Sequence, residues 1–116
     1  VVAHLDAIGS SALRGMRCVE LGAGTGVCGI ACSMLGASRV VLTDLPDALP
    51  LLRTNAARAC TGSSKRIDVC ALHWGEPSSL CDETFDVALC VDCVYQPACY
   101  ASLVATLRQL GAAHSI

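Results

Sequence analysis

Residues 19–29 read V-E-L-G-A-G-T-G-V-C-G, and this segment is the strongest indication of the fold. Its apolar start is typical of a short β-strand, its three closely spaced glycines of a tight loop, and the apolar run that follows of a helix. A strand, a glycine-rich turn and a helix in this order open a nucleotide-binding α/β unit. Glycine suits the loop because its backbone adopts positive φ and lets a ligand approach the main chain.

Two ligand patterns fit this loop. Gly24-x-Gly26-x-x-Gly29 satisfies the dinucleotide fingerprint G-x-G-x-x-G. Glu20-x-Gly22-x-Gly24-x-Gly26 satisfies an acidic-x-G-x-G-x-G pattern, which resembles motif I of methyltransferases that use S-adenosylmethionine (SAM). The loop alone leaves both interpretations open.

Composition limits the class of protein. The chain has 116 residues, 53% of them hydrophobic and 16% charged, with a net charge of −2. This length allows one small domain and is short for a complete doubly wound enzyme. The longest basic run is the pair Lys65-Arg66, so neither nucleic acid nor an anionic membrane is expected as a partner. No stretch has the length of a membrane span or the pattern of a signal peptide.

The chain contains nine cysteines, and most lie in apolar segments. An odd number in a core-rich chain indicates reduced, buried thiols in a cytoplasmic or nuclear protein, and not a secreted disulfide framework. Cys90-x-x-Cys93 has no second pair to complete four zinc ligands, so no metal site is expected.

Strands alternate with helices along the chain. This order predicts an α/β fold with a parallel sheet, in which ligands bind beyond the carboxyl ends of the strands. A leading helix is indicated by Val2, Leu5, Ile8 and Leu13, and the last helix has an apolar stripe of Leu103, Val104, Leu107 and Leu110. The predicted strands span residues 17–21, 39–43, 66–72 and 85–91, two middle helices span residues 27–35 and 47–60, and the last helix spans residues 96–110.

Three strand ends carry candidate ligand residues. Asp44 follows the second strand, 18 residues beyond Gly26, where a carboxylate suits the two hydroxyls of a ribose, although it would also suit a helix cap. Trp74, the only tryptophan, follows the third strand and would lie against an adenine ring or pack in the core. Asp92 follows the fourth strand, and Tyr95 comes three residues later, a spacing that brings both side chains to one side; a turn cap is the alternative for Asp92.

Four segments taken in order make a resemblance specific. V-E-L-G-A-G-T-G, V-L-T-D-L-P, A-L-H-W-G and F-D-V-A-L-C-V-D-C-V-Y resemble successive motifs of methyltransferase family 16, over about residues 5–110. This resemblance implies a Rossmann-like class I SAM-dependent methyltransferase fold, of which the chain supplies the N-terminal portion. The implied activity is SAM-dependent methylation of a lysine side chain in a protein substrate.

The resemblance also implies site residues. Asp92 and Tyr95 lie at the methyl-transfer end, where Asp92 would hold the incoming ammonium group and Tyr95 orient the amine. His73 stands where the family has Asp or another small polar residue, so an imidazole nitrogen would accept from the adenine amino group, or that contact is lost. The implied cofactor-binding residues are Glu20, Gly22, Gly24, Gly26, Asp44, His73, Trp74 and Val91.

Two other classes compete with this interpretation. One is a non-catalytic SAM-fold interaction module, and the other is a Rossmann protein that binds a nicotinamide or flavin cofactor. The family fold has seven strands in the order 3-2-1-4-5-7-6, and the chain supplies four, with a fifth beginning near Ser115. Residues 1–116 are therefore expected to be a partial domain that leaves the apolar strand 85–91 at an edge and prone to aggregate.

Overall fold

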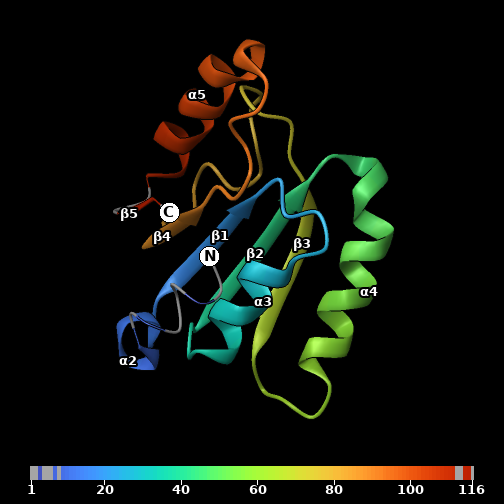
Figure 1. Cartoon of the computed structure of the whole chain (residues 1–116), viewed down its shortest axis with the longest axis vertical. Helices are drawn as coiled ribbons and strands as arrows, with labels where there is room; N and C mark the ends of the chain where they lie inside the picture. The colour runs from blue at the N-terminus through green and yellow to red at the C-terminus, as the bar shows by residue number, and fades with distance from the viewer. Residues whose placement is uncertain (1–2, 4–6, 8, 112–113, 116) are drawn as a thin grey trace.

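The computed structural model describes residues 3, 7, 9–111 and 114–115 of the chain. Its centre is a parallel sheet with the strand order β3-β2-β1-β4-β5 (Figure 1). The strands are β1 (Arg17–Leu21), β2 (Arg39–Asp44), β3 (Arg66–Ala71), β4 (Val87–Leu89) and β5 (His114–Ser115). The predicted parallel sheet is confirmed, and its order is the one implied by the resemblance.

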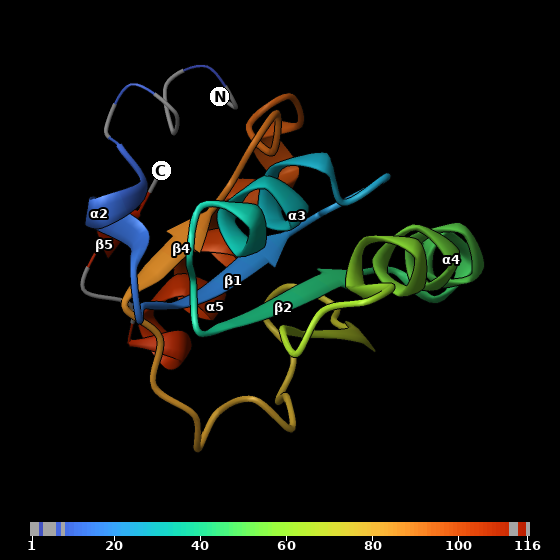
Figure 2. The same ribbon diagram turned by 90° about the horizontal axis from the view of Figure 1, so that it is seen from below.

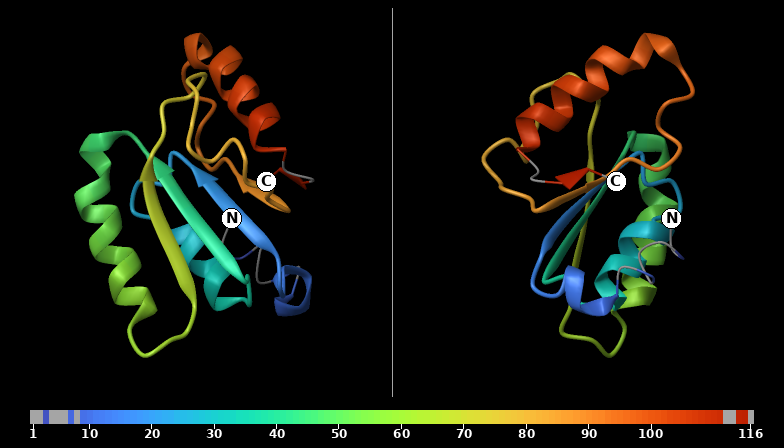
Figure 3. Two further views of the ribbon diagram at one scale, coloured as in Figure 1. Left: turned by 180° about the vertical axis from the view of Figure 1, so that it is seen from behind. Right: turned by 60° about the vertical axis from the view of Figure 1, so that its left-hand side comes forward.

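Helices cover both faces of the sheet. Helices α3 and α4 lie on one face and α5 lies on the other, as the views from below and from the side show (Figures 2 and 3). Within the described residues, no helix combines the length and apolar character needed to cross a membrane. The helices are α2 (Ser10–Leu13), α3 (Val27–Met34), α4 (Leu49–Cys60) and α5 (Tyr100–Leu110), and short 3₁₀ turns η1 (Pro46–Ala48) and η2 (Pro97–Cys99) precede the last two.

Two apolar cores follow from the alternation of side chains along the strands. Cys18 and Val40 point toward α3 and α4, whereas Val19 and Val41 point toward α5, and all four are fully buried. Since β1 and β2 are apolar on both faces, they occupy the middle of the sheet. All nine cysteines are free thiols, and four of them are buried.

The sheet differs from the prediction at its far edge. The predicted strand 85–91 is regular only at Val87–Leu89, and it is not the edge, because β5 pairs with Val87 and Ala88. The chain turns sharply beyond the end of this strand, at Asp92, which has a φ of 56°.

The buried face of α5 differs from the predicted apolar stripe. The stripe of α5 contains buried Leu103 and Leu110, but Val104 is 46% exposed and Thr106 is buried in its place. Residues three, four and seven apart share a helix face, so Val104 is rotated away from the sheet when Leu103 faces it. Val2, Leu5 and Ile8 of the predicted leading helix lie outside the described residues.

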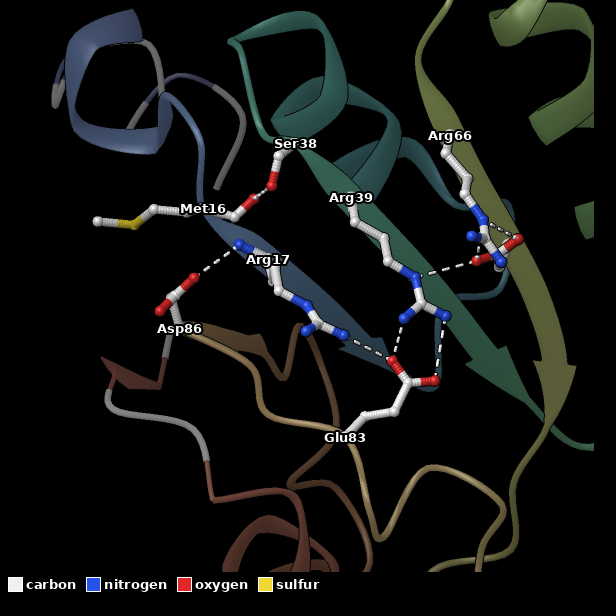
Figure 4. A network of polar contacts seen from close by, with 8 residues as sticks. Met16, Arg17, Ser38, Arg39, Arg66, Glu83 and Asp86 are labelled. Atoms are coloured by element: carbon white, nitrogen blue, oxygen red, sulfur yellow. Dashed lines mark hydrogen bonds and ion pairs between the residues drawn. The ribbon is translucent and has the colours of Figure 1, made fainter.

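A network of charges ties the long β3–β4 loop to the start of the sheet. Arg17, Arg39 and Arg66 open three neighbouring strands and lie in one register. Figure 4 shows Glu83 of the loop between Arg17 and Arg39; it accepts from Arg17 Nη2 at 2.8 Å and from both terminal nitrogens of Arg39. Asp68 bridges Arg39 and Arg66. Opposite charges thus offset a row of three guanidinium groups that would otherwise repel.

Candidate functional site

A cavity of about 400 Å³ lies at the carboxyl ends of the strands. This is where ligands bind in parallel α/β sheets, and the volume is within the range of small-molecule sites. Four strand ends and the first part of α5 enclose it. The lining residues are Gly22, Asp44, Leu45, Leu72, His73, Trp74, Glu76, Asp92, Cys93, Tyr95, Gln96, Ala98, Cys99 and Ser102.

The glycine loop closes against the opposite wall of this cavity. Gly22 has a φ of +63°, and a Cβ added there would lie 3.4 Å from Cζ2 of Trp74 and 3.5 Å from Sγ of Cys93. Cys93 is buried, and its thiol donates to the carbonyl of Leu21 at 3.1 Å. Burial is the main cause that raises the pKa of Cys93 to about 11, so this thiol stays protonated as a hydrogen-bond donor at neutral pH. The turn after β4 is therefore fastened to the end of β1.

Asp44 fastens the glycine loop to the end of β2. Its Oδ2 accepts from the amide of Gly24 at 2.7 Å, and its Oδ1 accepts from the amide of Leu45 at 2.7 Å. Neither η1 nor α4 has a side-chain cap, so the alternative role of Asp44 as a helix cap is wrong. A carboxylate oxygen accepts more than one hydrogen bond, so Asp44 can still bind hydroxyls in the cavity.

Glu20 is buried beneath the glycine loop and does not line the cavity. Its side chain is 3% exposed, and Oε2 accepts from the amide of Gly29, in the first turn of α3, at 2.8 Å. The pKa of Glu20 is raised to about 7, mainly by burial; the hydrogen bond from Gly29 lowers it, and the negative charge of Asp44 raises it. Gly29 is a packing residue, since an added Cβ would overlap Leu42 and lie 2.8 Å from Oε2 of Glu20.

The β3 end supplies an aromatic wall. Trp74 is half-buried, packs against the core on the α5 side, and also lines the cavity. His73 is exposed, with its Nδ1 3.9 Å from a carboxylate oxygen of Glu76. The next residue, Gly75, donates its amide to the hydroxyl of Thr106 on α5.

Asp92 and Tyr95 both line the open side of the cavity. In the described part of the chain, Asp92 is the one non-glycine residue with positive φ, a conformation that Asp tolerates better than most residues. Tyr95 is 70% exposed. The hydroxyl of Tyr100 donates to the carbonyl of Val94 at 3.0 Å, which ties this segment to the start of α5. Both residues of the predicted pair are thus among the lining residues of one cavity.

The structure separates the predicted residues into two sets. Gly22, Asp44, His73, Trp74, Asp92 and Tyr95 meet around the cavity. The other four do not line it: Glu20, Gly24 and Gly26 shape the loop, and Val91 packs against the core on the α3 side.

Sequence reasoning missed the remaining lining residues. Leu45, Cys93 and Gln96 directly follow predicted site residues, so an extension by one residue would have found them. Ser102 gave no such signal, because it belongs to a helix that was interpreted only by its apolar stripe.

The cavity lining is acidic. Asp44, Glu76 and Asp92 contribute carboxylates, and the described lining residues include no lysine or arginine. A cleft of this charge attracts cations. It suits a ligand that carries a positive centre.

Comparison with known proteins places the chain among methyltransferases. A family model described as lysine methyltransferase matches residues 2–116. EEF1A lysine methyltransferase 3 of Xenopus tropicalis is 41% identical over 84% of this chain and 42% of its own length. Protein N-lysine methyltransferase METTL21A of Danio rerio is 36% identical over 94% of this chain and 50% of its own length. The chain thus spans half or less of the length of these relatives.

Solved structures agree on the fold. Magnesium protoporphyrin IX methyltransferase (ChlM) from Synechocystis PCC 6803 with bound SAH (S-adenosylhomocysteine) matches with a TM-score of 0.72 at 19% identity, over 94% of this chain and 48% of that one. The S-adenosylmethionine-dependent methyltransferase SibL in its apo form matches with a TM-score of 0.61 at 22% identity, over 93% and 29% of the two chains. The class I SAM-dependent methyltransferase fold expected from the sequence is confirmed.

Proposed function

Because the chain belongs to the lysine methyltransferase family, we propose that it binds SAM in the cavity at the strand ends and methylates a lysine side chain of a protein. The observation that supports this proposal most strongly is that the predicted ligand residues meet in one place. Gly22, Asp44, Trp74 and Asp92 come from four different strand ends and line one cavity. A dinucleotide-binding protein would leave the last of these without a role.

The cavity fits the cofactor in three respects. Its volume of about 400 Å³ is that of a small-molecule site. Its carboxylates complement the positive charges that SAM carries on its sulfonium and amino groups. The wall at Gly22 has no Cβ, and an added Cβ would already contact Trp74 and Cys93, so glycine keeps this end of the cavity free of a side chain.

Each cavity residue has a separate task in this proposal. Asp44 accepts hydrogen bonds from the ribose hydroxyls while its loop contacts hold it in place. Trp74 supports the adenine ring with its indole face. When bound, SAM supplies an electrophilic methyl group for in-line transfer. Gly22 and the buried Glu20 keep the glycine loop in the shape that admits it.

The open side of the cavity receives the substrate. A lysine side chain has a pKa near 10.4 and must lose a proton before it attacks. Asp92 attracts the ammonium group into the cavity, the ammonium group releases its proton to solvent water, and Tyr95 orients the neutral amine through its hydroxyl. Positioning is the role assigned to Asp92, since an ordinary carboxylate is too weak a base to deprotonate lysine effectively.

Methyl transfer from labelled SAM tests these roles. EEF1A is the first substrate to try, because it is named in the similar frog and mouse enzymes. Asp92→Asn removes the charge and keeps a residue that tolerates positive φ, whereas Asp92→Gly keeps the backbone and removes the side chain. Both should lower the rate by at least about tenfold at saturating SAM.

Asp82→Asn, an exposed change outside the cavity, serves as the control and should keep the wild-type rate. If Asp92→Asn and Asp92→Gly also keep that rate, the role of Asp92 is wrong. If wild-type protein binds SAM but methylates no lysine in EEF1A or other proteins, a non-catalytic SAM-binding module replaces the proposed enzyme.

A further inference from the structure

Thr106 is a buried polar residue in the sheet-facing side of α5, where the neighbouring positions are apolar. Its side chain is 2% exposed. Its hydroxyl donates to the carbonyl of Ser102 at 3.0 Å and accepts from the amide of Gly75 at 2.8 Å. One hydroxyl has one hydrogen to donate and lone pairs to accept with, so both bonds form at once. Thr106 therefore joins α5 to the turn after β3.

The turn at Gly75 lies directly against α5. Gly75 has a φ of +84°, and an added Cβ would lie 3.1 Å from Oγ and 3.2 Å from Cβ of Ser102. The residue before it is Trp74, which lines the cavity opposite Gly22. A shift of this turn would move the indole relative to the glycine loop.

We propose that Thr106 is a positioning residue, which fixes the turn 73–75 on α5 and thereby sets Trp74 as a wall of the cavity. It touches neither cofactor nor substrate, since it does not line the cavity. Loss of its hydroxyl removes the acceptor of the part-buried Gly75 amide, and with it a hydrogen bond that holds the turn on α5. The proposal rests on the proposed function only where it calls this cavity a SAM site.

Three substitutions separate this role from ordinary helix stability. Thr106→Val keeps the shape and removes the hydroxyl, and Thr106→Ser keeps the hydroxyl. Thr54→Val is the control for loss of a hydroxyl bond within a helix, because the hydroxyl of the exposed Thr54 also donates to the carbonyl four residues back, that of Pro50, at 3.1 Å. Ser102 keeps its side chain in all three variants.

Two local measurements need no ligand. Amide hydrogen exchange at Gly75 should be slower in the wild type than at the exposed Gly62, and about tenfold faster in Thr106→Val than in the wild type. Fluorescence reports on Trp74 alone, since the chain has a single tryptophan. Its emission should shift to longer wavelength in Thr106→Val and keep the wild-type maximum in Thr106→Ser and Thr54→Val.

Binding of SAH, the product of the proposed reaction, extends the test to the cavity. Thr106→Val should weaken SAH binding several-fold, and Thr106→Ser should restore it. The proposal is overturned if wild-type Gly75 exchanges as fast as Gly62, a result that does not depend on any variant folding. It is also overturned if Thr106→Val changes emission and affinity no more than Thr54→Val. Failure of the wild type to bind SAH would contradict the proposed function, and the two local measurements would still decide the role of Thr106.

Discussion

The Glu20 carboxyl group is buried under the glycine loop, where burial raises its pKa from 4.5 to about 7. An unfolded chain releases this proton near pH 4.5, and the folded protein holds it to about pH 7. Folding therefore takes up a proton between these values. We expect the free energy of unfolding to fall by up to about 3 kcal/mol as the pH rises from 4.5 to 7.

Glu20→Gln cannot titrate but still accepts from the Gly29 amide, so it should lose this component of the pH dependence. Urea denaturation at a series of pH values measures the effect. Glu76→Gln, at an exposed position, is the control and should keep the wild-type slope. Parallel pH profiles for the wild type and Glu20→Gln would contradict the assignment.

Single residues were predictable from sequence where strand ends determine their place. Asp44, Trp74 and Asp92 follow apolar strands, so their meeting at one edge of a parallel sheet could be predicted. The hydrogen bonds of Asp44 to Gly24 and Leu45 could not, because they depend on the path of the loop. The burial of Thr106 was not predicted. From the sequence alone, a polar residue between apolar helix positions is expected to face solvent unless the rotation of the helix about its axis is known.

At the scale of elements, the contact between α3 and β2 depends on Gly29. Gly→Ala inside a helix ordinarily stabilises by about 1 kcal/mol. Here the added Cβ would overlap Leu42, so Gly29→Ala should instead destabilise by about 1–3 kcal/mol in chemical denaturation. A Leu42→Val background shortens the opposing side chain and should reduce that cost. An undiminished cost in this background would contradict the packing role.

The β3–β4 loop depends on Glu83, which pairs with Arg17 and Arg39 at the start of the sheet (Figure 4). The Glu83 side chain is 24% exposed, so the pairs are partly shielded from water. Glu83→Gln should lower the free energy of unfolding by about 1–2 kcal/mol. Asp82→Asn, next to it and exposed, should change it by less than about 0.5 kcal/mol. Equal effects of the two substitutions would show that the network adds no stability.

The elements themselves were largely predictable. β1 begins and ends at the predicted residues, because its short apolar run is bounded by a glycine on each side, Gly15 and Gly22. The path of residues 72–86 was not predictable, since it lacks periodicity and is held by long-range contacts such as Glu83 with Arg39. The pairing of β5 with β4 was also missed, because two residues carry no strand pattern.

At the scale of the whole molecule, alternating strands and helices form one sheet whose carboxyl ends share a single cavity. The cavity unites residues that lie as far apart in the chain as Gly22 and Ser102. The strand order was predicted from the resemblance of four ordered segments to known motifs. The structure gives a physical reason for part of this order: β1 and β2 are apolar on both faces and therefore lie inside the sheet.

Calorimetric titration of the protein with SAH and, separately, with NAD shows directly whether the cavity is a SAM site. The acidic cavity, the glycine loop at its end and the indole wall predict that SAH binds at one site per chain and that NAD does not bind. Binding of NAD, or of neither compound by the folded protein, would contradict the account.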